Sequence, residues 1–334
     1  MIAFWVVILL VSIGGTAFAS RRAVTSALSV VESSNVPPAV VGLTVMAIGT
    51  DLPEIANSIV SSASGHGDVN LGDSMGSVLT QITLTLGLLC LAGGTITTNR
   101  NFVIAVGTAT VFAVVTVRLL VNDGEFSHRD GLILIGLWLA GTALLGQGEL
   151  QERPELTEPA GRVAGELAST LGWLAIVGGL AVAVVDSFLR ITATLGIPEF
   201  VGSFVALSIG TSLPELFVDW TAIRRGASSM AIGDVFGSSF VDATLSVGIG
   251  PAIFGSSVSS DVLGGTTLVA VGVLLATVVV ARFRRYDWRL TVPLLAIYAV
   301  IQAITAGLAF RDGGSANPAI LASLEDLAVF RDWK

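Results

Sequence analysis

Apolar runs long enough to cross a membrane alternate with short polar segments along almost the whole chain. A helix that crosses the hydrocarbon core needs roughly 20 apolar residues. The sequence contains ten such runs, at residues 1–19, 38–63, 71–93, 101–121, 131–147, 164–188, 197–222, 230–254, 263–281 and 290–310. This pattern predicts an all-α polytopic membrane protein with ten transmembrane helices. A polar linker on the cytoplasmic side at 148–163 separates residues 1–147 from residues 164–310, and residues 311–334 form a C-terminal tail.

Two sequence blocks occur twice, at an offset of 161 residues. Gly-Thr-Asp-Leu-Pro-Glu at 49–54 returns as Gly-Thr-Ser-Leu-Pro-Glu at 210–215, and Gly-Asp-Ser-Met-Gly-Ser at 72–77 returns as Gly-Asp-Val-Phe-Gly-Ser at 233–238. Five crossings separate the second run from the seventh, so the two copies enter the membrane from opposite sides. We therefore predict two inverted five-helix repeats, an arrangement that places transporter sites where the repeats meet.

Composition excludes several classes of protein. The chain is 53% hydrophobic and 13% charged, with a mean hydropathy of +0.83, as expected of a membrane protein. The only lysine is the last residue, Lys334, which excludes a Walker A loop for ATP. One cysteine, Cys90, and two histidines, His66 and His128, disfavour a transition-metal site. We predict no cofactor, no nucleic acid partner and no enzymatic activity. The sequence does not indicate whether the protein is a monomer or an oligomer.

The basic residues indicate an orientation in the membrane. Eleven of the 17 lie in segments that are cytoplasmic if the N-terminus is outside, in agreement with the positive-inside rule. Ala17-Phe18-Ala19 resembles a signal-peptidase site, but no basic residue precedes it and Arg21 and Arg22 follow it. We therefore predict a multi-pass protein of the cell membrane with a retained first helix and an outside N-terminus.

Two glutamates follow prolines inside apolar runs. Glu54 comes directly after Pro53, and Glu215 directly after Pro214. Proline interrupts a helix, and such breaks persist in membranes where they line a polar cavity. No predicted helix centre carries an arginine or lysine that could pair with these acids. Both glutamates are therefore predicted to ligate a cation.

Other oxygen atoms surround the two breaks in sequence. Hydroxyl and carboxyl side chains precede the prolines, and two pairs in the second blocks are four residues apart, which places each pair on one helix face. Backbone carbonyls near the breaks add further oxygens. The predicted metal ligands are Ala47, Thr50, Asp51, Glu54, Ser77, Gln81, Ser208, Thr211, Ser212, Glu215, Ser238 and Asp242. An oxygen-only set suits a hard cation such as Ca²⁺.

The remaining acids have less specific interpretations. Asp73 and Asp234 lie one turn before the polar face of the second blocks. They are either acids on the ion pathway or helix N-caps. Asp186, Glu199 and Asp219 have no acidic counterpart in the other repeat, and we interpret them as solvated or capping residues.

The doubled motif resembles the alpha repeats of the sodium/calcium exchanger family, within the cation/Ca²⁺ antiporters. The resemblance implies that Glu54 and Glu215 are the central Ca²⁺ ligands and that the neighbouring hydroxyls and Asp242 complete Ca²⁺ and Na⁺ subsites. It also implies alternating access, with the first and sixth helices sliding across the core. The sequence departs from the family at Asp51, where Ser is usual, and at Gln81, where Asn or Asp is common.

The predicted function is therefore a secondary antiporter in the lipid bilayer that exchanges Na⁺ for Ca²⁺. A Ca²⁺/H⁺ antiporter is the alternative, because crowded carboxylates can carry a proton. An intramembrane aspartyl protease is a remote alternative, suggested by the Gly-Asp pairs at 72–73 and 233–234. The Gly-x-Gly-Asp signature of that class is absent, and the doubled Pro-Glu would have no role in it.

Overall fold

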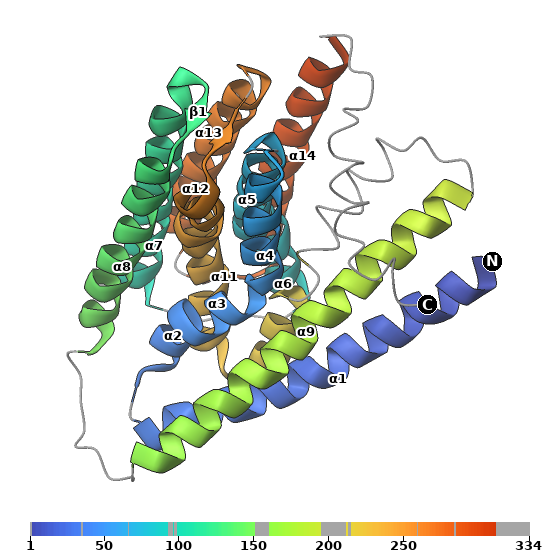
Figure 1. Cartoon of the computed structure of the whole chain (residues 1–334). Helices are drawn as coiled ribbons and strands as arrows, with labels where there is room; N and C mark the ends of the chain where they lie inside the picture. Colours follow the sequence, from blue (N-terminus) through green and yellow to red (C-terminus); the bar gives the residue numbers. More distant parts are fainter. Residues whose placement is uncertain are drawn as a thin grey trace.

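The protein is almost entirely helical in the computed structural model, which describes residues 2–34, 36–65, 67–92, 96, 99–150, 160–194, 212, 215–258, 260–283 and 285–311 (Figure 1). The first half contains α1 (Ile2–Ser34), α2 (Pro38–Val41), the π-helical η1 (Gly42–Met46), α3 (Ala47–Thr50), α4 (Leu52–Ala63), α5 (Gly67–Thr80), the π-helical η2 (Gln81–Thr85), α6 (Leu86–Ala92), α7 (Arg100–Leu120), the 3-10 turn η3 (Val121–Asp123), β1 (Glu125–Phe126) and α8 (His128–Leu150). The second half contains α9 (Ala160–Thr194), a helical segment at 215–224, α11 (Ser228–Val241), the π-helical η4 (Asp242–Ser246), α12 (Val247–Phe254), β2 (Ser256–Ser257), α13 (Ser260–Arg282) and α14 (Trp288–Arg311).

Several of these helices can cross a membrane. Within the described residues, seven are long and apolar enough, or eight if the bent pair Pro38–Thr50 and Leu52–Ala63 is one span. Large apolar side chains such as Leu132, Leu139 and Val292 face outward. The prediction of a helical polytopic membrane protein is confirmed. The predicted run 197–222 falls mostly outside the described residues, as do 312–334 of the predicted tail and 151–159 of the predicted linker.

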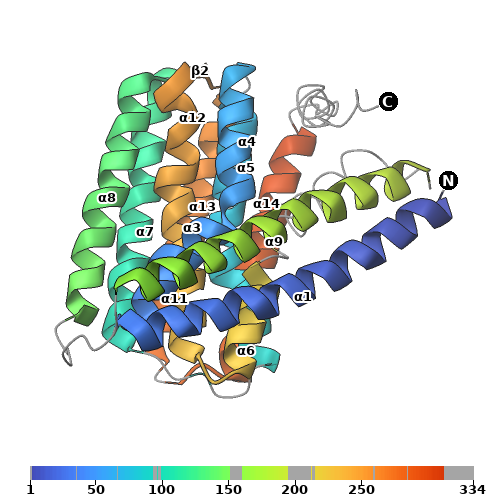
Figure 2. The ribbon, with the colours of Figure 1, turned by 60° about the horizontal axis from the view of Figure 1, so that its bottom comes forward.

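The helices α1 and α9 are longer than the sequence pattern predicted. They lie side by side and cross the other helices obliquely in both views (Figures 1 and 2). The predicted end of the first helix at residue 19 is wrong, because α1 continues to Ser34. Arg21 and Arg22 are exposed on its surface, so their charges do not require the helix to stop. The chain instead leaves the helix before Pro37, where a proline disfavours helical geometry in the preceding residue.

The second span is broken where the sequence predicted it. The segments α2, η1 and α3 are followed by α4 at an angle of 47°. Asp51 lies at the junction with φ −85° and ψ 8°, outside helical geometry. Pro53 is at the start of α4, where its missing N–H leaves no helical hydrogen bond unmade.

The boundaries of the elements repeat with the same offset as the sequence motifs. The bounds of α5 plus 161 are those of α11, and the bounds of η2 plus 161 are those of η4. Gly65 and Gly226, also 161 apart, both have positive φ, at 77° and 79°. The offset therefore applies to the backbone as well as to the motifs.

Two short backbone pairings obey the same offset. In the β1–β2 ladder Glu125 pairs with Ser257, and an isolated bridge joins Ile96 to Tyr286. Adding 161 to Glu125 gives Tyr286, and adding 161 to Ile96 gives Ser257. The same two positions of the repeat are thus bridged twice, each time between the first half and the second.

Small residues bring the broken span close to α11. A Cβ atom on Gly42 would collide with the Met230 carbonyl oxygen, and one on Gly233 would collide with the Ala39 carbonyl oxygen. Glycine therefore permits a backbone approach that no other residue allows. The close approach places the polar residues of α3 beside those of α11.

Candidate functional site

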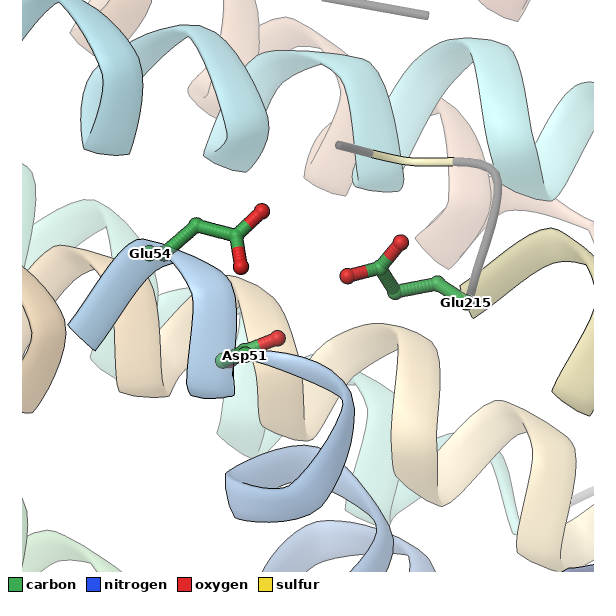
Figure 3. A group of neighbouring side chains, drawn as sticks. All are labelled: Asp51, Glu54 and Glu215. Carbon is green, nitrogen blue, oxygen red and sulfur yellow. The ribbon is translucent and has the colours of Figure 1, made fainter. Parts of the chain in front are cut away.

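Three carboxyl groups from the two halves of the chain meet inside the protein. Asp51 lies between α3 and α4, Glu54 lies in the first turn of α4, and Glu215 is in the helical segment 215–224. They point toward one another in Figure 3, and one oxygen from each lies within 4.8 Å of the others. All three side chains are at most 1% exposed. We refer to Asp51, Glu54 and Glu215 as the three-carboxylate cluster.

The cluster has few hydrogen-bond donors. Among the residues that the structure describes, neither oxygen of Glu54 or Glu215 has a hydrogen-bond partner, and Asp51 Oδ2 has none. The other oxygen, Asp51 Oδ1, accepts a long hydrogen bond of 3.5 Å from Thr50. No arginine, lysine or histidine is among the buried side chains of the described residues. Buried carboxylates without donors or counter-charges are strongly unfavourable, so this cluster requires bound cations or protons.

Gln81 and Asp242 are joined across the two halves. These residues are 161 apart, both are fully buried, and each is the first residue of a π-helical turn. Gln81 Nε2 donates a hydrogen bond of 3.0 Å to Asp242 Oδ2, while Asp242 Oδ1 has no hydrogen-bond partner in the part of the chain that the structure describes. Asp242 also interacts electrostatically with all three members of the cluster. Single π-helical turns are frequent at functional sites because they redirect side chains and backbone carbonyls.

Hydroxyl groups connect the broken span to α11. Thr50 Oγ1 lies 3.1 Å from Ser238 Oγ. Thr50 Oγ1 also lies 3.2 Å from the Ala47 carbonyl oxygen. That carbonyl accepts a hydrogen bond of 3.1 Å from the Asp51 N–H.

The other predicted ligands are placed only in part. Ser77 on α5 is 4% exposed and Ser212 is 6% exposed, and the Ser212 hydroxyl has no hydrogen-bond partner among the described residues. Ser208 and Thr211 lie outside the described residues. The structure thus joins Thr50 to Ser238 and Gln81 to Asp242, beside the three-carboxylate cluster.

Two interpretations of the remaining acids are wrong. Asp73 and Asp234 are each the seventh residue of their helices, α5 and α11, so neither is an N-cap. Asp219 is neither solvated nor capping, because it is fully buried inside the segment 215–224. Its position four residues after Glu215 puts it on the same helix face, and this spacing could have revealed it. Glu199 and the side chain of Asp186 lie outside the described part of the chain.

A set of carboxylate, hydroxyl and amide oxygens suits hard cations. Ca²⁺ takes carboxylates and neutral oxygens at roughly 2.3–2.6 Å in flexible geometry. The described residues bring no histidine or cysteine into this site, since Cys90 lies on α6 and His128 begins α8. The arrangement can therefore hold alkali or alkaline-earth ions, by charge and by oxygen coordination.

The sequence matches a known family over most of its length. The family described as "Sodium/calcium exchanger protein" matches residues 4–146 and 166–306. The membrane protein MJ0091 of Methanocaldococcus jannaschii is 32% identical over 219 residues, which are 65% of this chain and 71% of that protein. The sodium/calcium exchanger MaX1 of Methanosarcina acetivorans is 26% identical over 294 residues, with 75% of this chain and 84% of the relative covered.

A solved structure has a similar fold. The sodium-calcium exchanger NCX_Mj, soaked with 2.5 mM Na⁺ and 1 mM Sr²⁺, superposes with a TM-score of 0.75 at 25% sequence identity. The match covers 91% of this chain and 99% of that structure. The same protein soaked with 10 mM Na⁺ and no Ca²⁺ gives a TM-score of 0.73.

Proposed function

The chain belongs to the sodium/calcium exchanger family, and we propose that it is a secondary antiporter that exchanges Na⁺ for Ca²⁺ across a cell membrane. The observation that carries the proposal is the three-carboxylate cluster, in which Asp51, Glu54 and Glu215 converge with one long hydrogen bond and no basic partner among the described residues. Bound cations would supply the positive charge that these buried carboxylates need. In this proposal they are the transported substrates, not resident cofactors.

The proposed mechanism is competition for one set of oxygens. With Asp242, the site holds four carboxyl groups, and one Ca²⁺ or several Na⁺ ions neutralise part of their charge. The two ion sets share ligands, so one displaces the other. A site without cations keeps buried negative charge, which is costly in the low-dielectric interior. The empty protein therefore changes conformation slowly, and this makes exchange obligatory.

Alternating access is proposed from the arrangement of the helices. The repeated element bounds and the twice-formed backbone bridge support two inverted five-helix repeats, at 1–147 and 164–310, with ten helices in all. The pair α1 and α9 is proposed to slide over the remaining helices, because both are long and cross them obliquely (Figure 2). The N-terminus is proposed to face outside.

Ca²⁺/H⁺ exchange is the second candidate, and Asp51 is the observation that favours it. Ser212 occupies the equivalent position of the second repeat, so Asp51 adds one carboxyl group that the repeat does not require. Like charges at this separation favour protonation of one member when a cation is missing. The protease alternative has no such support, and Asp73 is engaged within its own half, where it accepts a hydrogen bond of 2.6 Å from Asn57.

Transport into proteoliposomes distinguishes the two candidates. Purified protein is reconstituted, and ⁴⁵Ca²⁺ uptake is measured with an outward Na⁺ gradient, with a pH gradient, or with neither. We expect uptake that follows the Na⁺ gradient and responds weakly to the pH gradient. Uptake on the pH gradient without Na⁺ would replace the proposal with Ca²⁺/H⁺ exchange. If neither the Na⁺ gradient nor the pH gradient drives Ca²⁺ uptake, both candidate functions are contradicted.

A further inference from the structure

A second pair of buried acids lies beyond the three-carboxylate cluster. Asp219 and Asp234 are 0% and 1% exposed, and no hydrogen bond is made to either carboxyl group within the described residues. The two carboxyl groups lie close enough to interact electrostatically with each other. Two buried acids that face each other cannot both carry a charge at low cost, and either a shared proton or a ligand of opposite charge would compensate it.

The pair continues the central site toward one end of the protein. Asp219 follows Glu215 by four residues on one helix, and Asp234 precedes Ser238 by four residues on α11. Each spacing keeps the two residues on the same helix face. Thr50 and Ser238 lie beside Asp234. A series of oxygens therefore leads from the three-carboxylate cluster toward the turn at 225–227, where the two helices meet.

The two equivalent side chains in the first half already have hydrogen-bond partners within the protein. The counterpart of Asp234 is Asp73, which accepts a hydrogen bond of 2.6 Å from Asn57 Nδ2. The counterpart of Asp219 is Ser58, whose hydroxyl accepts the Gly250 N–H at 3.1 Å. The protein itself satisfies these two groups. At the equivalent positions the second half has Asp219 in place of the Ser58 hydroxyl, and Val218 in place of the Asn57 amide.

The arginines near this pair are engaged elsewhere. Arg224 lies over the Trp220 ring, 5.7 Å from its centre, and is exposed. Arg225 donates a hydrogen bond to Thr25 on α1 and is exposed as well. Neither guanidinium group is buried with the two aspartates, so the counter-charge has to come from outside the described residues of the chain.

We infer that Asp219 and Asp234 bind a Ca²⁺ ion in transit between the three-carboxylate cluster and the 225–227 turn. A divalent ion cancels the charge of two carboxylates, whereas one Na⁺ leaves a net charge behind. The neighbouring hydroxyls and water complete a coordination shell of hard oxygen ligands. The inference deepens the proposed exchange and rests on it, since a transit site needs Ca²⁺ to pass.

Equilibrium binding of ⁴⁵Ca²⁺ to the purified full-length protein tests this site separately from the central one. In a Glu54→Gln, Glu215→Gln background, we expect one weak Ca²⁺ per protein to remain. Adding Asp219→Asn or Asp234→Asn should abolish it, while adding Asp73→Asn, the matched control, should not. Absence of residual binding in the background, or residual binding that survives Asp219→Asn and Asp234→Asn, would overturn the inference. Loss of binding with Asp73→Asn would do so too.

Thermal unfolding without divalent ions provides the folding control. Removing one of two facing acids should leave the Tm of Asp219→Asn equal to or above that of the unmodified protein. A lowered Tm would assign the pair a structural role and overturn the inference. Failure of the proposed exchange is detected in a different experiment, as an absence of Na⁺-driven Ca²⁺ uptake by the unmodified protein.

Discussion

The two halves of the chain share a backbone but not a distribution of charge. The helix and π-helical bounds of α5 and η2 reappear in α11 and η4 at an offset of 161. The side chains differ at equivalent positions. Gln81 in the first half corresponds to Asp242 in the second, and Asp51 corresponds to Ser212. The common backbone brings oxygens of both halves to one place, and the differences decide how much charge each half contributes. Substitutions at equivalent positions therefore test which features are shared.

The largest effect is expected where the halves agree. Replacing Glu54 or Glu215 with Gln preserves shape but removes one charge from the three-carboxylate cluster. Loss of one partner from a buried charge interaction costs about 3 kcal/mol, on the order of 100-fold in Ca²⁺ transport. The measurement is Na⁺-driven ⁴⁵Ca²⁺ uptake by folded protein. Glu32→Gln, at an exposed position of α1, is the matched control and should transport normally. Wild-type rates in either cluster variant would refute the assignment.

A smaller effect on Ca²⁺ transport is expected from Asp242, which differs in charge from its counterpart Gln81 but is hydrogen-bonded to it. Asp242→Asn keeps a hydrogen-bond acceptor for Gln81 and removes the charge that acts on the cluster. We expect the KM for Ca²⁺ to rise about tenfold, as for the loss of a charge at intermediate distance. Asp123→Asn, on an exposed turn, is the control. An unchanged KM in Asp242→Asn would show that this acid lies outside the ion site.

A still smaller effect is expected where only one half carries the acid. Asp51→Ser restores the symmetry with Ser212 and removes one of four carboxyl groups. Under the proposed coupling, this variant still exchanges Na⁺ for Ca²⁺, with a few-fold change in the KM of either ion. Flux is measured against Na⁺ and pH gradients in parallel. If the unmodified protein used a pH gradient without Na⁺ and Asp51→Ser lost that ability, the coupling ion would be H⁺.

No loss of activity is expected from the variants that test inversion. Ser64 and the equivalent Arg225 are exposed at the turns that follow α4 and the segment 215–224. Single cysteines at these positions, in a Cys90→Ala background, should react with an impermeant thiol reagent from opposite sides of the membrane. Labelling of both from the same side would contradict the inverted repeats.

Much of this architecture was predictable from local sequence. Apolar runs located most helices, and Pro53 located the break of the second span, because both signals act within one or two turns. The length of α1 was not predictable, since exposed Arg21 and Arg22 ended the apolar run without ending the helix. The N-cap interpretation of Asp73 failed because α5 begins at Gly67, four residues before its apolar run.

The candidate site was predictable as a set of residues but not as a set of contacts. The doubled motif predicted Glu54 and Glu215, whose proximity depends on tertiary packing. The hydrogen bond between Gln81 and Asp242 joins two distant helices, and only the shared offset hinted at it. Burial of Asp219 was missed because a lone acid near the end of an apolar run usually reaches water.

The central claim is that both halves of the chain bind one cation together. A crystal of this protein soaked with Sr²⁺, with anomalous diffraction measured, tests it most directly. The account predicts a peak within roughly 2.3–2.7 Å of carboxylate oxygens from both Glu54 and Glu215, as for oxygen-coordinated alkaline-earth ions. A central peak bound by oxygens of only one half, or no peak at the three-carboxylate cluster, would contradict it.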